Sequence, residues 1–278
     1  MTGEAALPSS VRGRVVAALS LAIPVCAGLA YLWAYDAPRA YLAVNAGTLL
    51  VALLAIAFHP KRLSVTVRRV LIALALLLLF VPLATGPSLG GVERWLPLGP
   101  FILNAGLLAL PALAVLLGAE PDYAPGITGV AVLAALLQPD LALGAALTVM
   151  TLGLYDATRD WRHGVVAVVA FTASLVAATQ GEIAAQPFAD RVIFLLARTD
   201  MLGALGLTAA MLAGFVLILA GTGSEPSRKA LAGCLFGFTF AGHVSNYPSP
   251  LVGYGAAAIL GFGLALTLLG ATREPIRA

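Results

Sequence analysis

The sequence predicts an all-α fold, a polytopic transmembrane helix bundle of about ten spans with both termini in the cytoplasm. Apolar runs separated by short polar breaks fill the chain almost from Val15 to Ala271. Of the 278 residues, 60% are hydrophobic and 10% are charged, and the mean hydropathy is +0.98, a balance typical of a chain with the bilayer as its solvent. The backbone must satisfy its own hydrogen bonds in hydrocarbon, so each run is expected to be a helix.

The polar breaks place the spans in order within a single domain of residues 1–278. Each apolar run is about long enough to cross a hydrocarbon core of about 30 Å. The predicted spans cover residues 15–34, 41–58, 68–85, 101–118, 124–138, 140–155, 164–180, 192–220, 230–244 and 251–271. The break between the fifth and sixth spans is so short that a tight or re-entrant hairpin is an alternative there.

The basic residues predict the orientation of the chain. With the N-terminus inside, all but four of the 16 lysines and arginines fall on cytoplasmic segments. The four outside are Arg39, Arg94, Arg191 and Arg198. Such an inside excess is the positive-inside signature, and it requires an even number of spans. We therefore expect residues 1–14 and 272–278 to be cytoplasmic tails.

The composition also argues against several classes of protein. The net charge of +3 does not indicate a nucleic-acid partner, because the basic residues sit at helix ends, where they orient the chain. Cys26 and Cys234 lie in apolar runs without a CxxC spacing, so neither a metal site, a cofactor nor a disulfide is expected. The first apolar run is long enough to remain as a span, and we expect no cleaved signal peptide.

The break 90–100 is rich in turn residues and carries a charged pair beside an aromatic ring. Arg94 could contact the pyrophosphate of a substrate or another anionic headgroup, since a guanidinium binds phosphate well. The ordinary interpretation is an interfacial residue neutralised by Glu93 or by lipid phosphate, with Trp95 as a membrane-interface anchor. On chemistry alone, the ordinary interpretation is favoured.

Two further breaks have the character of caps. In Gln138-Pro139-Asp140, Asp140 is expected to cap the next helix, because the flanking runs offer no other ionisable group for a proton relay. The segment 243–255 contains two prolines and is expected to fold back as a fixed connection. Its lone His243 is a poor metal ligand and is interpreted as a hydrogen-bonded interfacial residue.

Carboxylates cluster near the start of the eighth span. Asp190, Arg191, Arg198 and Asp200 lie there, with Glu182 across a short break. A general base could be drawn from this cluster. Acidic and basic groups at an interface more often neutralise each other, and that interpretation leads.

The order of three motifs resembles the SEDS family of bacterial cell-wall synthesis (FtsW, RodA and SpoVE). Arg94-Trp95-Leu96 with Gly99 resembles the family's Arg-Trp-Ile stretch and its glycine, and Gln138-Pro139-Asp140-Leu141 resembles Gln-Pro-Asp-Leu-Gly. The run from Pro248 through Pro250 and Tyr254 to Gly255 follows Pro-Leu-Pro-Phe-Ile-Ser-Tyr-Gly without a gap. The resemblance spans roughly Gly90 to the C-terminus. Gln138, Pro139, Asp140, Pro248, Pro250, Tyr254 and Gly255 are thus structural-motif residues.

Departures from the family fall where it keeps its polar groups. In place of Gln-Pro-Ser-Glu-x-x-Lys this chain has 104–110, Asn-Ala-Gly-Leu-Leu-Ala-Leu, without the acid and the lysine. The large outer loop after the seventh span is reduced to a few residues. The family's presumed catalytic aspartate aligns with Val192, and Asp190 could replace it only after a two-residue slip.

The resemblance implies a membrane protein of the bacterial inner membrane that serves cell shape or division. Active members polymerise lipid II, an undecaprenyl-linked precursor, into peptidoglycan. Because the reactive groups are missing, we expect a non-polymerising scaffold or precursor-binding protein in contact with membrane lipid and another membrane protein. The alternatives are a glycosyltransferase with Asp190 as catalytic residue, a structural subunit of a larger complex and, last, a transporter. Arg94, Trp95, Arg191 and Tyr247 are the expected substrate contacts around an open groove, and the alternative is a closed bundle in which Leu107 and Leu110 fill that space.

Overall fold

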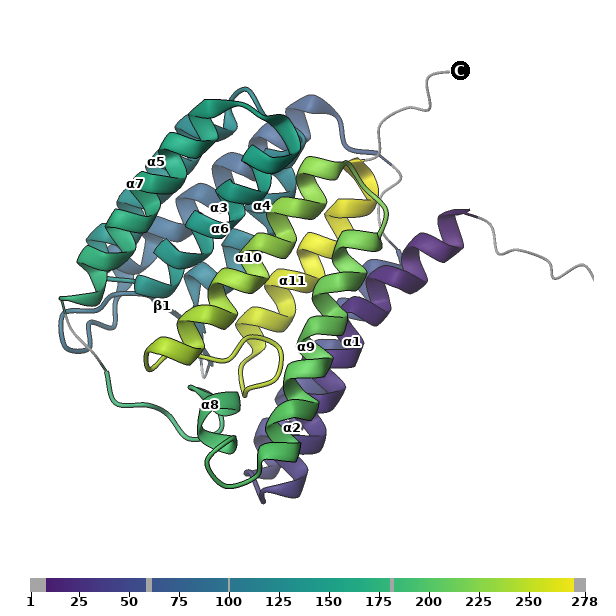
Figure 1. Cartoon of the computed structure of the whole chain (residues 1–278), viewed down its shortest axis with the longest axis vertical. Coiled ribbons are helices and arrows are strands. Elements are labelled where there is room, and N and C mark those ends of the chain that lie inside the picture. The colour runs from purple at the N-terminus through teal and green to yellow at the C-terminus, as the bar shows by residue number, and fades with distance from the viewer. Residues whose placement is uncertain (1–8, 59–61, 100, 181–182, 273–278) are drawn as a thin grey trace, which may run out of the picture.

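The computed structural model describes residues 9–58, 62–99, 101–180 and 183–272, and in them the chain forms a bundle of antiparallel and parallel helices (Figure 1). The long helices are α1 (Ser9–Ala34), α2 (Arg39–Ala57), α3 (Val65–Thr85), α4 (Ala105–Gly118), α5 (Ala124–Leu137), α6 (Leu141–Thr158), α7 (Trp161–Ala178), α9 (Met201–Ala220), α10 (Glu225–Val244) and α11 (Ala256–Leu269). The shorter elements are α8 (Val192–Leu196), the 3-10 turn Gly270–Thr272 and the strands β1 (Trp95–Leu98) and β2 (Phe101–Asn104).

The protein is a polytopic helical membrane protein. Six helices, α1, α2, α3, α6, α7 and α9, are long and apolar enough to cross a membrane, and α4, α5 and α11 are shorter apolar helices. Successive long helices run back and forth between two ends of the bundle (Figure 1). The strands, α8 and the connection between α10 and α11 gather at one of them, which we call the hairpin end. The exact number of spans and the cytoplasmic location of the termini stay predictions.

Polar residues placed just before six of the described helices mark where these begin. A side-chain oxygen at each such position accepts a hydrogen bond from a backbone N–H of the first turn, which would otherwise have no partner. These capping residues are Ser64, Asn104, Asp140, Asp160, Asp200 and Ser224. The starts of these six helices are therefore marked by single polar residues within largely apolar sequence.

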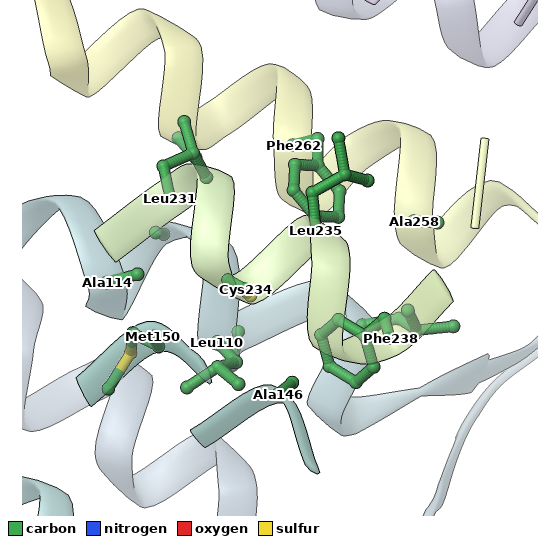
Figure 2. Packing of buried hydrophobic residues seen from close by; sticks show 14 of the residues in the cluster. Leu110, Ala114, Ala146, Met150, Leu231, Cys234, Leu235, Phe238, Ala258 and Phe262 are labelled. Atoms are coloured by element: carbon green, nitrogen blue, oxygen red, sulfur yellow. The ribbon is translucent and has the colours of Figure 1, made fainter. Parts of the chain in front are cut away.

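Helix α10 is the centre of the core and packs closely on α6 and α4 (Figure 2). A Cβ atom added at Gly233 would lie 2.4 Å from the backbone oxygen of Val149, and one at Gly237 would lie 2.5 Å from the Cα of Ala146. Only glycine allows the two backbones to approach this closely, as expected for helices that associate in lipid. The contact fixes α6, and with it the break that precedes α6.

Several predicted boundaries are wrong, in each case because a polar or turn residue interrupts an apolar run. The predicted span 192–220 is two helices, since the chain turns after α8 and Asp200 caps α9. The predicted span 101–118 begins only at Ala105, because the residues before it form β2, which pairs with β1 in the register Trp95↔Asn104. The last span begins at Ala256 instead of 251.

Other helices start earlier than expected. Helices α1, α2, α3, α7 and α10 begin two to six residues before the predicted positions, because hydropathy does not register the polar first turn of a helix. Helices α5 and α6 are separate, joined only by residues 138–140. The cytoplasmic-tail predictions for residues 1–8 and 273–278 lie outside the described residues.

Candidate binding cavity

A cavity of about 340 Å³ lies at the hairpin end of the bundle. Its walls come from the segment 87–89, the β1–β2 hairpin, the loop 183–190, the loop 248–255, the start of α11, and single residues of α2 and α4. The polar side chains that line it are Arg94, Asn104, Gln186, Asp190, Ser249 and Tyr254. The apolar part of the wall includes Val44, Leu89, Ile102, Leu103 and Leu107. Charged and apolar surfaces thus meet in one hollow, a composition suited to an amphipathic ligand.

Arg94, directly before β1, is the cation of this cavity. The side chain is 5% exposed, and its Nε has no hydrogen-bond partner. The guanidinium carbon lies 4.9 Å from the ring centroid of Trp95 and 4.0 Å from that of Tyr247. The ion pairs among the described residues do not include Arg94. Its neutralisation by Glu93, the ordinary interpretation of the sequence, is therefore not observed.

Asp190 is the only carboxylate among the described residues that line the cavity. It is 7% exposed, and its Oδ2 accepts a hydrogen bond of 2.8 Å from the backbone N–H of Gln186. Burial raises the pKa of the Asp190 carboxyl, while the Gln186 N–H and the charge of Arg94 oppose that rise. The carboxylate and the guanidinium influence each other across the cavity without forming an ion pair.

The loop that carries Asp190 is held by hydrogen bonds to a segment distant in sequence. The N–H of Ser249 donates to the carbonyl of Ala189 at 2.9 Å, and the N–H of Arg191 donates to the carbonyl of Tyr247 at 3.0 Å. The hydroxyl of Ser249 accepts from the N–H of Val192 at 2.9 Å. These bonds fix the position of the carboxylate, although its own loop has no regular structure over most of its length.

The opposite wall is held by Asn45, a residue of α2 that the sequence analysis missed. Its side chain is fully buried, donates to the carbonyl of Gly253 at 3.0 Å and accepts from the N–H of Gly255 at 3.1 Å. Beside it, the ring of Tyr254 stacks on Tyr41 with 3.7 Å between centroids. A lone asparagine within an apolar span is the signal that could have identified this position, because such residues are retained at a cost.

The Gln138-Pro139-Asp140 break supports the structure behind the cavity. Gln138 is buried, and its Nε2 donates to the carbonyl of Leu79 in α3. Asp140 is 1% exposed, and its Oδ1 accepts from the N–H of Leu143 at 3.0 Å. The prediction that Asp140 caps the next helix is thereby confirmed. None of the three residues lines the cavity.

The expected substrate contacts divide into two groups. Trp95 lines the cavity, and Tyr247 lies behind Arg94, 6% exposed and outside the lining. Arg191 is also outside the lining, because its Nη2 points to the carbonyl of His243 at 3.4 Å and its guanidinium lies over the ring of Phe194. The structure therefore brings Arg94, Trp95 and Asp190 together and directs Arg191 elsewhere.

The other charged residues near α8 have separate contacts. Asp200 caps α9 and accepts a hydrogen bond of 2.7 Å from the hydroxyl of Tyr35. The guanidinium carbon of Arg198 lies over the ring of Phe194, 4.8 Å from the ring centroid. Glu182 lies outside the described residues. The ion pairs among the described residues include none of Asp190, Arg191, Arg198 and Asp200. The expectation that these residues neutralise each other is therefore not met in the described structure.

Leu107 and Leu110 do not close the cavity. Leu107 forms part of its wall, whereas Leu110 is fully buried in the core beside α10 (Figure 2). Asn104, also missed from the sequence, both caps α4 and lines the cavity. Within the described ranges, no group of three or more His, Cys, Asp or Glu could hold a metal ion.

Solved structures share this architecture. The chain is similar to the crystal structure of the rod shape-determining protein RodA from Thermus thermophilus, with 24% identity over 94% of this chain and 97% of that chain, and a TM-score of 0.62. A point mutant of the same protein gives 24% identity, coverages of 95% and 98%, and a TM-score of 0.64. A chain from a peptidoglycan synthase complex gives 22% identity, coverages of 91% and 96%, and a TM-score of 0.60.

No protein-family model and no curated protein matches the sequence. The structural similarity nevertheless extends over nearly the whole length of both compared chains. It includes the part before Gly90, where no sequence motif indicated a resemblance. The resemblance read from three short motifs is confirmed at the level of the fold: this chain has the fold of RodA, a SEDS protein.

Proposed function

We propose that the protein is a SEDS-type protein of the bacterial inner membrane, active in cell-wall synthesis, that binds a lipid-linked precursor without polymerising it. The observation that carries the proposal is the juxtaposition of Arg94 and Asp190, both buried and unpaired with each other, in one cavity. The hairpin end then corresponds to the outer face of the membrane. In this proposal the cavity receives the pyrophosphate and the adjacent sugar of an undecaprenyl-linked precursor.

The charge of Arg94 supports an anionic ligand. A buried guanidinium without a carboxylate partner is costly, and a phosphate group that enters the cavity would compensate the cost through charge-assisted hydrogen bonds. The unpartnered Nε of Arg94 is one donor available for such a bond. Asp190 supplies an acceptor for a sugar hydroxyl in the same space.

The size of the cavity limits what it can enclose. Its 340 Å³ is near the lower end of the range of about 300–1,000 Å³ for small-molecule sites. A phosphate and one sugar fit this volume better than a complete disaccharide with its peptide. The apolar wall around Ile102, which is 63% exposed, suits the start of a prenyl chain.

The wall chemistry supports binding over polymerisation. Leu107 and its neighbours give α4 an apolar surface where the resemblance implies an acid and a lysine. Asp190 is left as the single carboxylate of the described lining. One carboxylate can hold a hydroxyl, but the described part of the lining offers no second carboxylate to share the work of proton transfer.

A second candidate is a glycosyltransferase. The raised pKa of Asp190 favours it, because a carboxylate whose pKa is raised is a stronger base than an ordinary one. Asp190 would take the proton of the acceptor hydroxyl as that oxygen bonds to the anomeric carbon, and the pyrophosphate would leave toward Arg94. This candidate needs the same cavity and differs only in turnover.

A membrane-protein partner belongs to the proposal as well. One of the solved structures of like fold is part of a peptidoglycan synthase complex, and we propose that this chain also acts beside another membrane protein. A purely structural subunit would need the partner and not the cavity. The two possibilities separate in a binding experiment.

The experiment uses the full chain in nanodiscs, with labelled lipid II as the probe for both binding and polymer formation. We expect binding without polymer. Arg94→Gln should weaken binding at least tenfold, whereas Arg198→Gln, which alters an arginine at the same end outside the cavity, should not. Polymer formed by the wild type and lost in Asp190→Ala would establish the glycosyltransferase instead. Absence of binding above empty nanodiscs would leave the structural subunit.

A further inference from the structure

Tyr247 lies behind Arg94 and does not reach the cavity. Its ring centroid is 4.0 Å from the Arg94 guanidinium carbon, closer than the 4.9 Å of the Trp95 ring. Tyr247 is 6% exposed and is not among the residues that line the cavity. A ligand bound beside Arg94 would therefore have this ring on the far side of the guanidinium.

Hydrogen bonds hold the backbone of Tyr247 on both sides of its side chain. The backbone N–H of Tyr247 donates to the carbonyl of Ser245 at 2.9 Å, and its carbonyl accepts from Arg191 at 3.0 Å. Burial raises the pKa of the phenol, and the nearby carboxylate of Asp140 raises it further, so the hydroxyl stays neutral at physiological pH. The capping residue of α6 is thus adjacent to the phenol. Tyr247 thus offers a buried aromatic face on a hydrogen-bonded backbone.

An arginine side chain that lines a cavity without an ion-pair partner requires another contact to hold it in one conformation. The side chain is long and flexible, and ordering it costs conformational entropy. Asp190 faces the same cavity, and direct pairing with it would neutralise the charge that an anion needs. Attraction between the guanidinium and an aromatic face is stronger in a desolvated site than at an exposed one. The ring can hold the cation without neutralising it.

We infer that Tyr247 is a positioning residue, whose ring holds the Arg94 guanidinium ready for a phosphate group in the cavity. The inference rests on the proposed function of Arg94. It adds that the affinity for an anion depends on a side chain that never touches the ligand. It also connects the Gln138-Pro139-Asp140 break to the cavity, since Asp140 is adjacent to the Tyr247 phenol.

The test changes the electrostatics of the ring without changing its shape. The full chain in nanodiscs is titrated with undecaprenyl pyrophosphate, comparing the wild type with Tyr247→Phe and with 3,4,5-trifluorophenylalanine at position 247. Tyr247→Phe keeps the aromatic face, so its affinity should stay within about twofold. Fluorination weakens the negative face of the ring, and affinity should fall about tenfold, which corresponds to about 1.4 kcal/mol.

Phe194 provides the matched control. It contacts the guanidinium groups of Arg191 and Arg198, at 4.1 and 4.8 Å, outside the cavity lining. Trifluorophenylalanine at position 194 therefore weakens a similar contact and should leave the affinity unchanged. A residue that merely fills space at position 247 would show equal affinities for Phe and its trifluoro derivative, and that result overturns the inference.

The outcomes also separate this inference from the one on which it rests. If the wild type binds undecaprenyl pyrophosphate and Arg94→Gln weakens the binding, but fluorination at position 247 has no effect, only the positioning role fails. If the wild type does not bind the probe, the proposed function fails and the positioning role with it.

Discussion

Arg94 and Asp190 line the same cavity but do not form an ion pair with each other. Each is held by its own partners, Arg94 by two aromatic rings and Asp190 by the backbone N–H of Gln186. Separate opposite charges in a buried site are costly, and they persist where the surrounding structure fixes both. The arrangement is that of a site prepared for a ligand with both an anionic group and hydrogen-bond donors.

Asp190→Asn should change how stability depends on pH. The folded pKa of Asp190 lies above its unfolded value, so ionisation of Asp190 opposes folding. This unfavourable contribution is fully present above the raised pKa and disappears as the pH falls toward the unfolded value. The asparagine variant should exceed the wild type in thermal stability near pH 8, and the difference should shrink on acidification. Differential scanning fluorimetry in detergent from pH 4 to 8 measures it.

If the stability of the wild type does not approach that of Asp190→Asn as the pH falls, the raised pKa of Asp190 in the folded protein is contradicted. Asp200→Asn is the control, because the Asp200 pKa is lowered by its hydrogen bonds with the Gly203 N–H and Tyr35. Its ionisation favours folding, so its difference from the wild type should have the opposite sign and should also vanish at low pH.

Replacement of Asp140 should separate its capping role from its charge. Asp140→Ala removes the acceptor for the Leu143 N–H and should cost about 1 kcal/mol of stability. Asp140→Asn retains a good capping side chain and should cost much less. Unfolding of both variants in mild detergent, followed by circular dichroism, checks the order. Equal losses would indicate that the charge, and not the cap, is what α6 needs.

Asn45→Leu should loosen the loop that forms one wall of the cavity. The change removes two buried hydrogen bonds and leaves backbone groups of Gly253 and Gly255 without partners, at about 1–3 kcal/mol each. Hydrogen exchange across residues 245–255 should accelerate. Thr48→Val, one turn along α2, removes only a bond within the helix and should leave the exchange unchanged. Unaltered hydrogen exchange in Asn45→Leu would contradict the conclusion that Asn45 holds this loop in place.

Gly233→Ala should destabilise the contact between α10 and α6. The added methyl group would stand 2.4 Å from the Val149 carbonyl oxygen, so the helices must move apart, at about 1–3 kcal/mol. Gly206→Ala in α9 meets nothing within 4 Å and should be neutral or stabilising, because alanine favours the helix. Thermal unfolding of the pair tests the close packing directly. Equal midpoints would contradict it.

The sequence predicted the helices and part of their ends for a clear physical reason. Hydropathy locates a span because the bilayer demands it, and a short polar residue such as Asp140 marks a helix start through a local bond. The β1–β2 hairpin escaped prediction because its residues are as apolar as those of α4. The break before α9 escaped because it adds only a few residues to a long apolar run.

The cavity could not be derived from the sequence alone. Arg94 and Asp190 meet only through tertiary packing, and no local pattern determines whether two loops so far apart enclose a space or fill it. Arg191, next to Asp190 in sequence, was expected in the same site, but its left-handed backbone conformation, with φ of 53°, accompanies a side chain that contacts Phe194 instead. Adjacency in sequence was a poor guide there.

The two hydrogen bonds of Asn45 couple the position of α2 along its axis to the position of one wall of the cavity. Gly253 and Gly255 lie in the cavity wall, and Asn45, which is hydrogen-bonded to both, is a buried residue of α2. A displacement of α2 along its axis must therefore carry this wall with it or break both bonds. A neighbouring protein or a bilayer of different thickness that shifts α2 would reshape the cavity without contacting it.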